Sequence, residues 1–431
     1  ININEKQLCS DTPEDTRPCA PNGHNIFNTN VVFDRHGTVV SRYRKVHLYG
    51  EPRNSTFVPE SVSFDTDFNV TFGHFICFDI LFYAPAHEMR LTQGIRDFVF
   101  PTMWFSQLPF LTAVQVQLGW SYANDVNLLA AGSSHTEYGS TGTGIFNGRK
   151  GTITSVMNLD EGERRIYVAQ VPKYPSSAVT SQRRVATQRQ KQRLGQSLEQ
   201  RALARSSAGF KMKRDDALEL YESVWLQQER NVTKDVCHGS LCCHFELEWS
   251  PVQAGESPSG YRVGAFDGWR NEQDVDNNYV RNCGIFVCSG PNIEDCGLLL
   301  NATASNRNFS RLLIEASYPK SQEFLLTPNS VRDNLLPLEP SQFEWSVQEE
   351  EQSHLLSVRF ALAEAESLSN LLTFAIYGNY YDDICTYGID TPDKDIQCGY
   401  KPKGDGAADL RFFGNWFHML TVVLLIVSLS S

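Results

Sequence analysis

Residues 73–82, GHFICFDILF, predict a short buried strand that ends in a cysteine. Phe75 and Ile76 have the apolar character of the strand, Cys77 stands at its carboxyl end, and Asp79 suits the opening of a turn or helix. A cysteine on such a bend can turn its sulfur toward a pocket, where backbone N–H groups beyond the bend can hold an oxyanion. The alternative is an inert cysteine, because free cysteines are commonly buried as small apolar residues.

The chain after Cys77 alternates between strand patterns and longer helical patterns. The helical patterns cover residues 85–90 and 110–122, and the strand patterns cover residues 97–101 and 127–131. This order predicts parallel neighbouring strands with helices packed on the sheet, which is an α/β layered domain. Ligands bind at the carboxyl ends of such strands, where Cys77, Trp104 and His135 all fall as candidate pocket residues. His135 is a candidate partner for the thiol, and an ordinary loop histidine is the alternative.

A β-hairpin is predicted before the Cys77 strand. Residues 30–33 and 38–47 have strand character, and a turn at residues 34–37 joins them. Side-chain alternation places Lys45 on the same face as Tyr43. A lysine at such a position is ordinarily a solvated edge residue, so the pattern alone gives Lys45 no function.

The composition of the 431 residues favours a secreted globular protein. The formal net charge of −12 argues against a nucleic-acid binder, because phosphate binding needs a positive surface. Eleven cysteines suit an oxidising compartment, and their odd number leaves one thiol unpaired, for which Cys77 is the natural candidate. Cys9 and Cys19 bracket a loop and predict a local disulfide. Five Asn-x-Ser/Thr sequons add to the prediction of a glycoprotein: Asn54, Asn69, Asn231, Asn301 and Asn308.

The pattern of the chain changes after its first third. We expect a first domain over residues 1–175, a basic polar linker over 176–214 and a β-rich domain over 215–403. The linker carries ten Lys and Arg residues against one acidic residue; a solvated segment is predicted, with an RNA-binding or membrane-surface arm as the alternative. The cysteines and histidines of residues 237–244 resemble a zinc knuckle, but disulfides are the better prediction in a secreted chain.

Both ends of the chain carry information about processing. Residues 419–429 are apolar, and small residues around Gly406 precede them across a spacer, which predicts a glycosylphosphatidylinositol attachment signal over residues 404–431. A marginal membrane helix or a buried terminal helix is the alternative. The chain begins at Ile1 without an initiator methionine or a signal peptide, so we expect a fragment that lacks its N-terminal part.

Over nearly its whole length the chain resembles the vanin/biotinidase branch of the nitrilase superfamily. The matching motifs are RYRK at 42–45, CFDILF at 77–82, NTNVVFD at 28–34, FPT-x-W at 100–104, LCCH at 241–244 and GAFDG at 264–268. The branch consists of amidases that carry a Glu, Lys and Cys triad on an αββα sandwich. The resemblance therefore implies such a sandwich, with its N-terminal part missing, followed by the β-rich, disulfide-containing C-terminal domain of the branch.

Carried onto this sequence, the resemblance implies a role for several residues. Cys77 is the nucleophile, and Lys45 lowers the thiol pKa and stabilises the oxyanion together with the backbone N–H of Phe78. Glu51 matches a secondary acidic residue of the family. The general-base glutamate has no match before Lys45, so we expect it upstream of Ile1. For the same reason we expect the chain alone to fold poorly and to be inactive.

The implied activity is hydrolysis of a linear carboxamide through a cysteine thioester, with no cofactor and no metal. Pantetheine, cleaved to pantothenate and cysteamine, is the favoured substrate, and a biotin amide such as biocytin is the alternative. A catalytically inactive, membrane-anchored recognition protein on the same scaffold is the alternative from another class. The tail resembles the glycolipid anchor of vanins, so we expect the protein at the extracellular face of the cell membrane, with no nucleic-acid partner.

Overall fold

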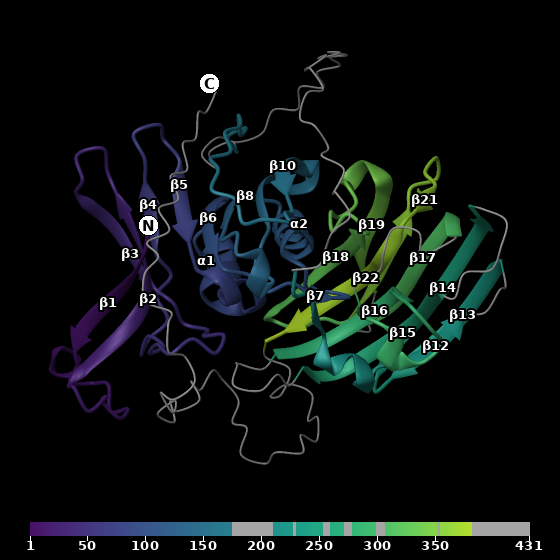
Figure 1. The fold of residues 1–431 in the computed structure, drawn as a ribbon, viewed down its shortest axis with the longest axis horizontal. Helices are drawn as coiled ribbons and strands as arrows, with labels where there is room; N and C mark the ends of the chain where they lie inside the picture. The colour runs from purple at the N-terminus through teal and green to yellow at the C-terminus, as the bar shows by residue number, and fades with distance from the viewer. Residues whose placement is uncertain are drawn as a thin grey trace.

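The computed structural model describes residues 1–174, 210–226, 230–252, 259–270, 278–298, 307–350 and 354–381. An α/β unit, coloured from purple to blue in Figure 1, is followed by a strand-rich unit, coloured from teal to yellow. This arrangement confirms the predicted fold class. Among the described residues, no helix is both long and apolar enough to cross a membrane. The predicted attachment signal at 404–431 with Gly406, the sequon at Asn301 and residues 175–209 of the predicted linker lie outside the described residues.

A mixed six-stranded sheet forms the centre of the first unit, in the order β10-β9-β8-β6-β5-β4. Its strands are β4 (Ser63–Asp65), β5 (Thr71–His74), β6 (Asp97–Thr102), β8 (Asn127–Gly132), β9 (Thr143–Asn147) and β10 (Thr152–Val156). Strands β5, β6 and β8 pair in parallel, as the alternation of strand and helix patterns predicted. Their carboxyl ends therefore meet at one edge of the sheet, which is where Cys77 follows β5.

Two helices cover one face of this sheet, α1 (Glu88–Thr92) and α2 (Ala113–Asn124). Trp120 of α2 packs edge-on against Phe98 of β6, with ring centroids 5.2 Å apart. Helix α2 begins after Thr112, three residues later than its apolar pattern predicted, because Phe110 instead packs into the strand-rich unit. Helix α1 likewise begins later than predicted, since a π-helical turn at Tyr83–His87 precedes it.

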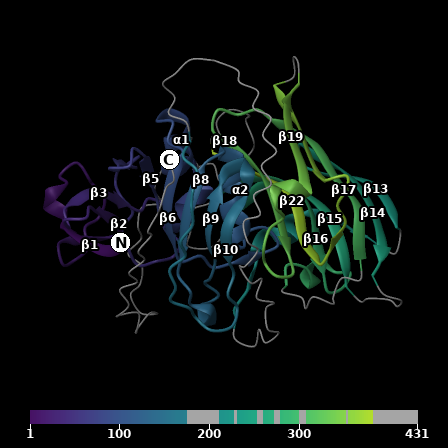
Figure 2. The ribbon, with the colours of Figure 1, turned by 90° about the horizontal axis from the view of Figure 1, so that it is seen from above.

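A three-stranded antiparallel sheet lies beside the β4–β5 edge, as Figures 1 and 2 show. It contains β1 (Asn2–Leu8), β2 (His24–Phe33) and β3 (Val39–Arg44), and the β2–β3 pair confirms the predicted hairpin. His74 of β5 joins the two sheets, because its ring nitrogens lie 2.8 Å from Ser41 Oγ and 2.7 Å from Asn30 Oδ1. The described residues thus supply three of the layers of the predicted αββα sandwich.

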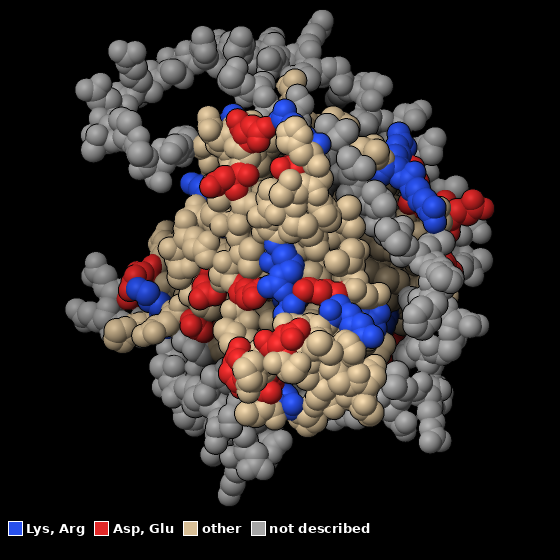
Figure 3. Space-filling view, turned by 90° about the vertical axis from the view of Figure 1, so that its left-hand side faces the viewer, with Lys and Arg blue, Asp and Glu red and all other residues tan. Residues whose placement is uncertain are grey.

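Figure 3 views the molecule from the side of this three-stranded sheet, and acidic and basic side chains alternate across it. Glu5 of β1 forms ion pairs with Arg42 and Arg44 of β3, at 3.3 and 2.6 Å. Charges of both signs therefore lie paired on this face.

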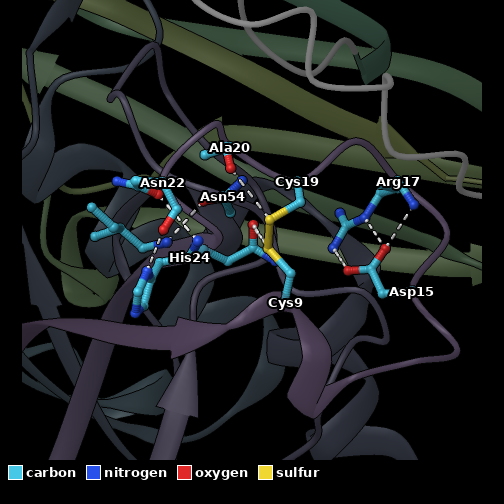
Figure 4. The surroundings of a disulfide bond; sticks show 10 residues. Cys9, Asp15, Arg17, Cys19, Ala20, Asn22, His24 and Asn54 are labelled. Atoms are coloured by element: carbon cyan, nitrogen blue, oxygen red, sulfur yellow. Dashed lines mark hydrogen bonds and ion pairs between the residues drawn. A yellow bond between two sulfur atoms is a disulfide. The ribbon is translucent and has the colours of Figure 1, made fainter.

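Cys9 and Cys19 form the predicted local disulfide (Figure 4). Arg17, inside the loop that this disulfide closes, donates to the backbone oxygen of Ser55 at 3.0 Å. The side chain of Asn54 accepts a hydrogen bond from the β2 backbone at 2.8 Å (Figure 4). These contacts fix the segment that follows Lys45 against the three-stranded sheet.

Two antiparallel sheets form the strand-rich unit. The first contains β12 (Glu222–Leu226), β15 (Gly260–Arg270), β16 (Asn278–Cys288), β22 (Leu371–Tyr380) and β18 (Phe324–Arg332). The second contains β13 (Asn231–His238), β14 (Leu241–Pro251), β17 (Arg307–Pro319), β20 (Leu355–Leu362), β19 (Phe343–Glu349) and the short β21 (Leu368–Ser369). The sheets pack face to face, since the rings of Phe360 and Phe374 stack between them at 3.8 Å.

Disulfides, rather than a zinc knuckle, account for the cysteines of this unit. The bonds are Cys237–Cys242, Cys243–Cys283 and Cys288–Cys296, and Cys243–Cys283 joins β14 of one sheet to β16 of the other. No cluster of metal-ligating side chains occurs in the described ranges. Cys385 and Cys398 lie beyond them.

The two units share one core and one small sheet. Strand β11 (Lys213–Arg214) pairs in parallel with β7 (Gln107–Leu108) of the first unit. The predicted solvated linker therefore ends earlier than residue 214, because the backbone of β11 finds hydrogen-bonding partners in β7. On the other side of the junction, Gln115 of α2 donates to Asn329 Oδ1 of β18 at 2.6 Å. The β7–β11 pair is important for the site, because it holds the segment that follows Trp104.

Candidate active site

Cys77 lies on a sharp bend at the carboxyl end of β5. Its φ of 52° is in the left-handed region, which costs a residue with a Cβ about 1–2 kcal/mol. A 3₁₀ turn, Cys77–Leu81, begins at the same residue. Its sulfur lies 3.5 Å from the backbone oxygen of Met103, which follows β6. Within the described part of the chain, Cys77 is the single free cysteine, as the odd cysteine count predicted.

Lys45 follows β3 directly, and its side chain is buried rather than solvated, with 2% of its surface exposed. Its Nζ lies 2.5 Å from Glu51 Oε1. Burial acts to lower the pKa of Lys45, but the neighbouring charges of Glu51, Cys77 and Asp79 outweigh it and raise this pKa above its ordinary value. Lys45 therefore carries a fixed positive charge beside the thiol.

Glu51 is held as an anion by donors on both carboxylate oxygens. Oε1 accepts from Lys45 and, at 3.3 Å, from Asn28, while Oε2 accepts from the Tyr49 N–H at 2.6 Å. Burial acts to raise the pKa of Glu51, but the Lys45 charge and these hydrogen bonds hold it below its ordinary value. A carboxylate with a lowered pKa is a weak base, so Glu51 suits the role of a counterion that orients Lys45.

Asp79 connects the segment that carries Lys45 to the bend that carries Cys77. Its Oδ2 accepts from the Tyr43 hydroxyl at 2.8 Å and from the Ile76 N–H at 3.0 Å. Its Oδ1 accepts from the His47 N–H at 2.9 Å. Tyr43 and His47 flank Lys45 in sequence, and Ile76 precedes Cys77. One buried carboxyl group therefore fixes the backbone on both sides of the site.

Opposing effects act on the pKa of the Cys77 thiol. Burial raises the pKa of Cys77 above its ordinary value, and the Lys45 charge offsets only part of this increase. The negative charge of Glu51 acts in the same direction as burial and raises this pKa further. Lys45 therefore acts on the thiol pKa in the direction that the resemblance implies, but burial outweighs it, so a base that removes the thiol proton would assist the attack.

A cavity of about 290 Å³, which includes the open solvent at its mouth, lies over Cys77. Apolar side chains form most of its wall. They are Phe78, Leu81, Met103, Trp104, Phe105 and Leu111. Trp104 Nε1 donates to the Leu111 backbone oxygen at 2.9 Å, so Trp104 presents its apolar surface to the cavity. Tyr49, Gln107 and Arg270 complete the lining.

Two family models match this chain. The carbon-nitrogen hydrolase family matches residues 12–114, which contain Lys45 and Cys77, and the Vanin C-terminal domain matches residues 210–384. Vanin-like protein 1 of Drosophila melanogaster is 56% identical over 443 residues, which cover 100% of this chain and 77% of that protein. The chain belongs to the vanin/biotinidase branch of the nitrilase superfamily. It is therefore a member of a family of hydrolases that act on non-peptide carbon–nitrogen bonds.

More distant members of the branch differ in their named substrates. A human protein named pantetheine hydrolase VNN2 is 33% identical over 311 residues, which cover 71% of this chain and 55% of that protein. A biotinidase of Bos taurus is 28% identical over 398 residues, which cover 88% of this chain and 70% of that protein. Family membership thus supports an amidase, and the identity of the substrate depends on the pocket.

The chemistry of a carbon–nitrogen hydrolase needs a nucleophile, a group that stabilises the oxyanion and a pocket for the acyl chain. The charge of the buried Lys45 acts on the Cys77 thiol, and Phe78 follows Cys77 with its backbone N–H at the start of the 3₁₀ turn. Trp104 lines the cavity, as predicted. His135 is not part of the cavity lining; its ring faces Glu137, with 3.3 Å between Nδ1 and Oε1.

The described asparagines of the predicted glycosylation sites differ in their solvent exposure. Asn69 and Asn231 are exposed, whereas Asn54 and Asn308 are half-buried.

Three further residues line the cavity that no sequence pattern had indicated: Tyr49, Gln107 and Arg270. Gln107 lies three residues after Trp104, in the segment that follows β6, so its position after a strand end was a usable signal. Arg270 comes from β15 of the strand-rich unit, and nothing local in the sequence relates it to residue 77.

Proposed function

We propose that the protein hydrolyses a linear carboxamide through a thioester on Cys77, and that pantetheine is its substrate. The observation that carries this proposal is a free thiol on a left-handed bend that lines an apolar cavity, and on which the charge of the buried Lys45 ammonium group acts. The relative named pantetheine hydrolase, 33% identical over 311 residues, supports the choice of substrate.

The reaction proceeds in two steps. The Cys77 sulfur attacks the amide carbonyl carbon, a base takes the thiol proton, and the oxygen becomes an oxyanion beside Lys45 and the Phe78 N–H. Collapse of this intermediate breaks the carbon–nitrogen bond, and cysteamine leaves with the proton. Water then attacks the thioester, which releases pantothenate and restores the thiol. We propose that the base is the upstream glutamate implied by the family, because Glu51 is committed to Lys45.

The test is a comparison of pantetheine and biocytin hydrolysis by the full-length protein, side by side. Cys77→Ser and Lys45→Met should each reduce kcat at least about 100-fold, since one oxyanion donor alone is worth about 100- to 1,000-fold. Lys173→Met serves as a matched control, because Lys173 is exposed and donates only to the Phe68 backbone oxygen among its described contacts. Biocytin as the better substrate would support the biotinidase alternative. A folded protein that hydrolyses neither amide would support the inactive recognition protein.

We also propose that the protein is a secreted-type glycoprotein held at the extracellular face of the cell membrane by a glycolipid. The four disulfides of the described residues support an oxidising compartment. Phosphatidylinositol-specific phospholipase C should release the protein from intact cells, and retention on the cells would contradict the anchor.

A further inference from the structure

The cavity over Cys77 has a polar group that comes from the strand-rich unit. Arg270, the last residue of β15, lines the cavity together with Cys77. Its side chain is 4% exposed, and a buried guanidinium is costly unless it is paired and hydrogen-bonded. Arg270 Nε lies 3.3 Å from Asp215 Oδ1, and its Nη2 donates to Gln107 Oε1. The guanidinium is therefore neutralised on one side and oriented on the other.

The polar side chains of the cavity form one connected chain of hydrogen bonds. Gln107 Nε2 donates to the Tyr49 hydroxyl at 3.1 Å, and Lys213 Nζ donates to the same hydroxyl at 2.7 Å. Gln107 in turn accepts from Arg270. Of these groups, Tyr49, Gln107 and Arg270 line the cavity, whose wall is otherwise aromatic and aliphatic apart from Cys77. In an apolar pocket, a few fixed polar groups orient the ligand and determine which ligands bind.

The balance of charge limits what these groups can recognise. Asp215 is 2% exposed and compensates the charge of Arg270 inside the protein. A ligand carboxylate would have to compete with Asp215, whereas a hydroxyl or amide oxygen can accept a hydrogen bond from the guanidinium while the ion pair stays intact. The position thus favours an uncharged polar group.

We propose that the Arg270–Gln107 pair is a specificity determinant for the acyl part of the substrate, which selects acyl chains that carry an uncharged hydroxyl or amide group. This inference rests on the proposed amidase function, and it makes the strand-rich unit a part of the active site. The pantothenoyl group, which carries two hydroxyls and an internal amide, belongs to the selected class. A plain alkyl chain of equal length does not belong to this class, because it contacts the apolar wall but forms no hydrogen bond with the Arg270–Gln107 pair.

The test compares two amides of cysteamine in the full-length protein, pantetheine and an alkanoyl amide whose acyl chain has the same length. The wild-type protein should prefer pantetheine by about 10- to 100-fold in kcat/KM, as expected for a hydrogen bond to a charged group. Arg270→Lys keeps the charge for Asp215 but loses the planar fork, so the ratio of the two kcat/KM values should fall about tenfold. Most of this change should appear in KM.

Arg281→Lys provides the matched control. Arg281 lies on the neighbouring strand β16, is 2% exposed and pairs with Asp267 at 2.9 Å, but it does not line the cavity. Its replacement should disturb the fold to a similar degree and leave the ratio unchanged. The proposal is overturned if the wild-type ratio is near one, or if Arg270→Lys lowers kcat/KM for both amides equally.

A second measurement separates this inference from the proposed function. If the protein hydrolyses neither amide, the proposed function fails, and ligand binding is then followed by the rate at which iodoacetamide alkylates Cys77. Pantothenate should protect the thiol at about tenfold lower concentration than the alkanoic acid of equal length, and Arg270→Lys should abolish this difference. Equal protection by the two acids in the wild-type protein would overturn the proposal.

Discussion

Replacement of Asp79 by asparagine should damage both the stability of the site and its catalysis. The two carboxyl oxygens each accept a backbone N–H, one from His47 and one from Ile76. Asparagine offers one oxygen and one NH₂ group, so one of these buried N–H donors loses its acceptor whichever way the amide is turned. An unsatisfied buried donor costs about 1–3 kcal/mol. The midpoint of denaturant-induced unfolding should decrease accordingly.

The effect on catalysis follows from what Asp79 connects. Its loss frees the segment of Lys45 from the bend of Cys77, and a displacement of about 1 Å at a reacting group costs on the order of 100-fold in rate. We therefore expect kcat of Asp79→Asn to fall about 10- to 100-fold, with KM changed much less. The rate of Cys77 alkylation by iodoacetamide, measured against pH, should shift as well, because the Lys45 charge no longer has a fixed position.

Asp97→Asn is the matched control for this experiment. Asp97 is also buried on the six-stranded sheet, but it accepts from the side chain of Asn127 at 2.7 Å, which an asparagine oxygen can replace. We expect a loss of less than about 1 kcal/mol and normal kcat. The reasoning is refuted if Asp79→Asn unfolds at the wild-type midpoint with kcat within about twofold of normal, or if Asp97→Asn reproduces its effect on kcat.

Three further changes test other parts of the account. Lys45→Met should raise the pKa of Cys77 further and slow its alkylation at neutral pH about tenfold or more; an unchanged rate would contradict the role of the Lys45 charge. Removal of the Cys243–Cys283 disulfide, which closes a 40-residue loop, should cost about 4 kcal/mol in denaturant unfolding without a reductant, and a cost below about 1 kcal/mol would argue against its importance. Burial lowers the pKa of both His87 and His74 to about 4, so the unfolded chain binds the extra protons between pH 6.5 and 4, and each residue should contribute a loss of stability of up to about 1.4 kcal/mol per pH unit as the pH decreases. His87→Gln should reduce the slope of this dependence by about half, which thermal unfolding at several pH values would show; an equally steep decline would exclude a contribution from His87.

Local patterns were sufficient to predict the frame of the site. The alternation of strand and helix patterns correctly gave the parallel β5, β6 and β8, because each of these elements buries a face that its own sequence encodes. The bend at Cys77 and the position of Trp104 followed from their places after strand ends. The pairing of Cys9 with Cys19 followed from their short separation.

The remainder of the site depends on contacts between distant residues. Gln107 and Arg270 are 163 positions apart, and no periodicity relates them. The solvent exposure expected for Lys45 was an average property of lysines on strands. Its burial is offset by the ion pair with Glu51, and Glu51 lies on a loop that is hydrogen-bonded to the β2 backbone. The effect of Lys45 on the thiol pKa has the expected direction, but the burial of Cys77, which raises this pKa, depends on the tertiary fold and could not be predicted from local sequence.

The central claim is that Cys77 forms a thioester with the acyl part of the substrate. Full-length protein mixed with pantetheine, quenched in acid within the first turnovers and digested, should yield a peptide around Cys77 whose mass has increased by the pantothenoyl group. Treatment with hydroxylamine should remove the added mass, as it does for a thioester, and Cys77→Ser should yield no such peptide. Rapid hydrolysis of pantetheine by Cys77→Ser, or an acyl group found on another residue, would contradict the account.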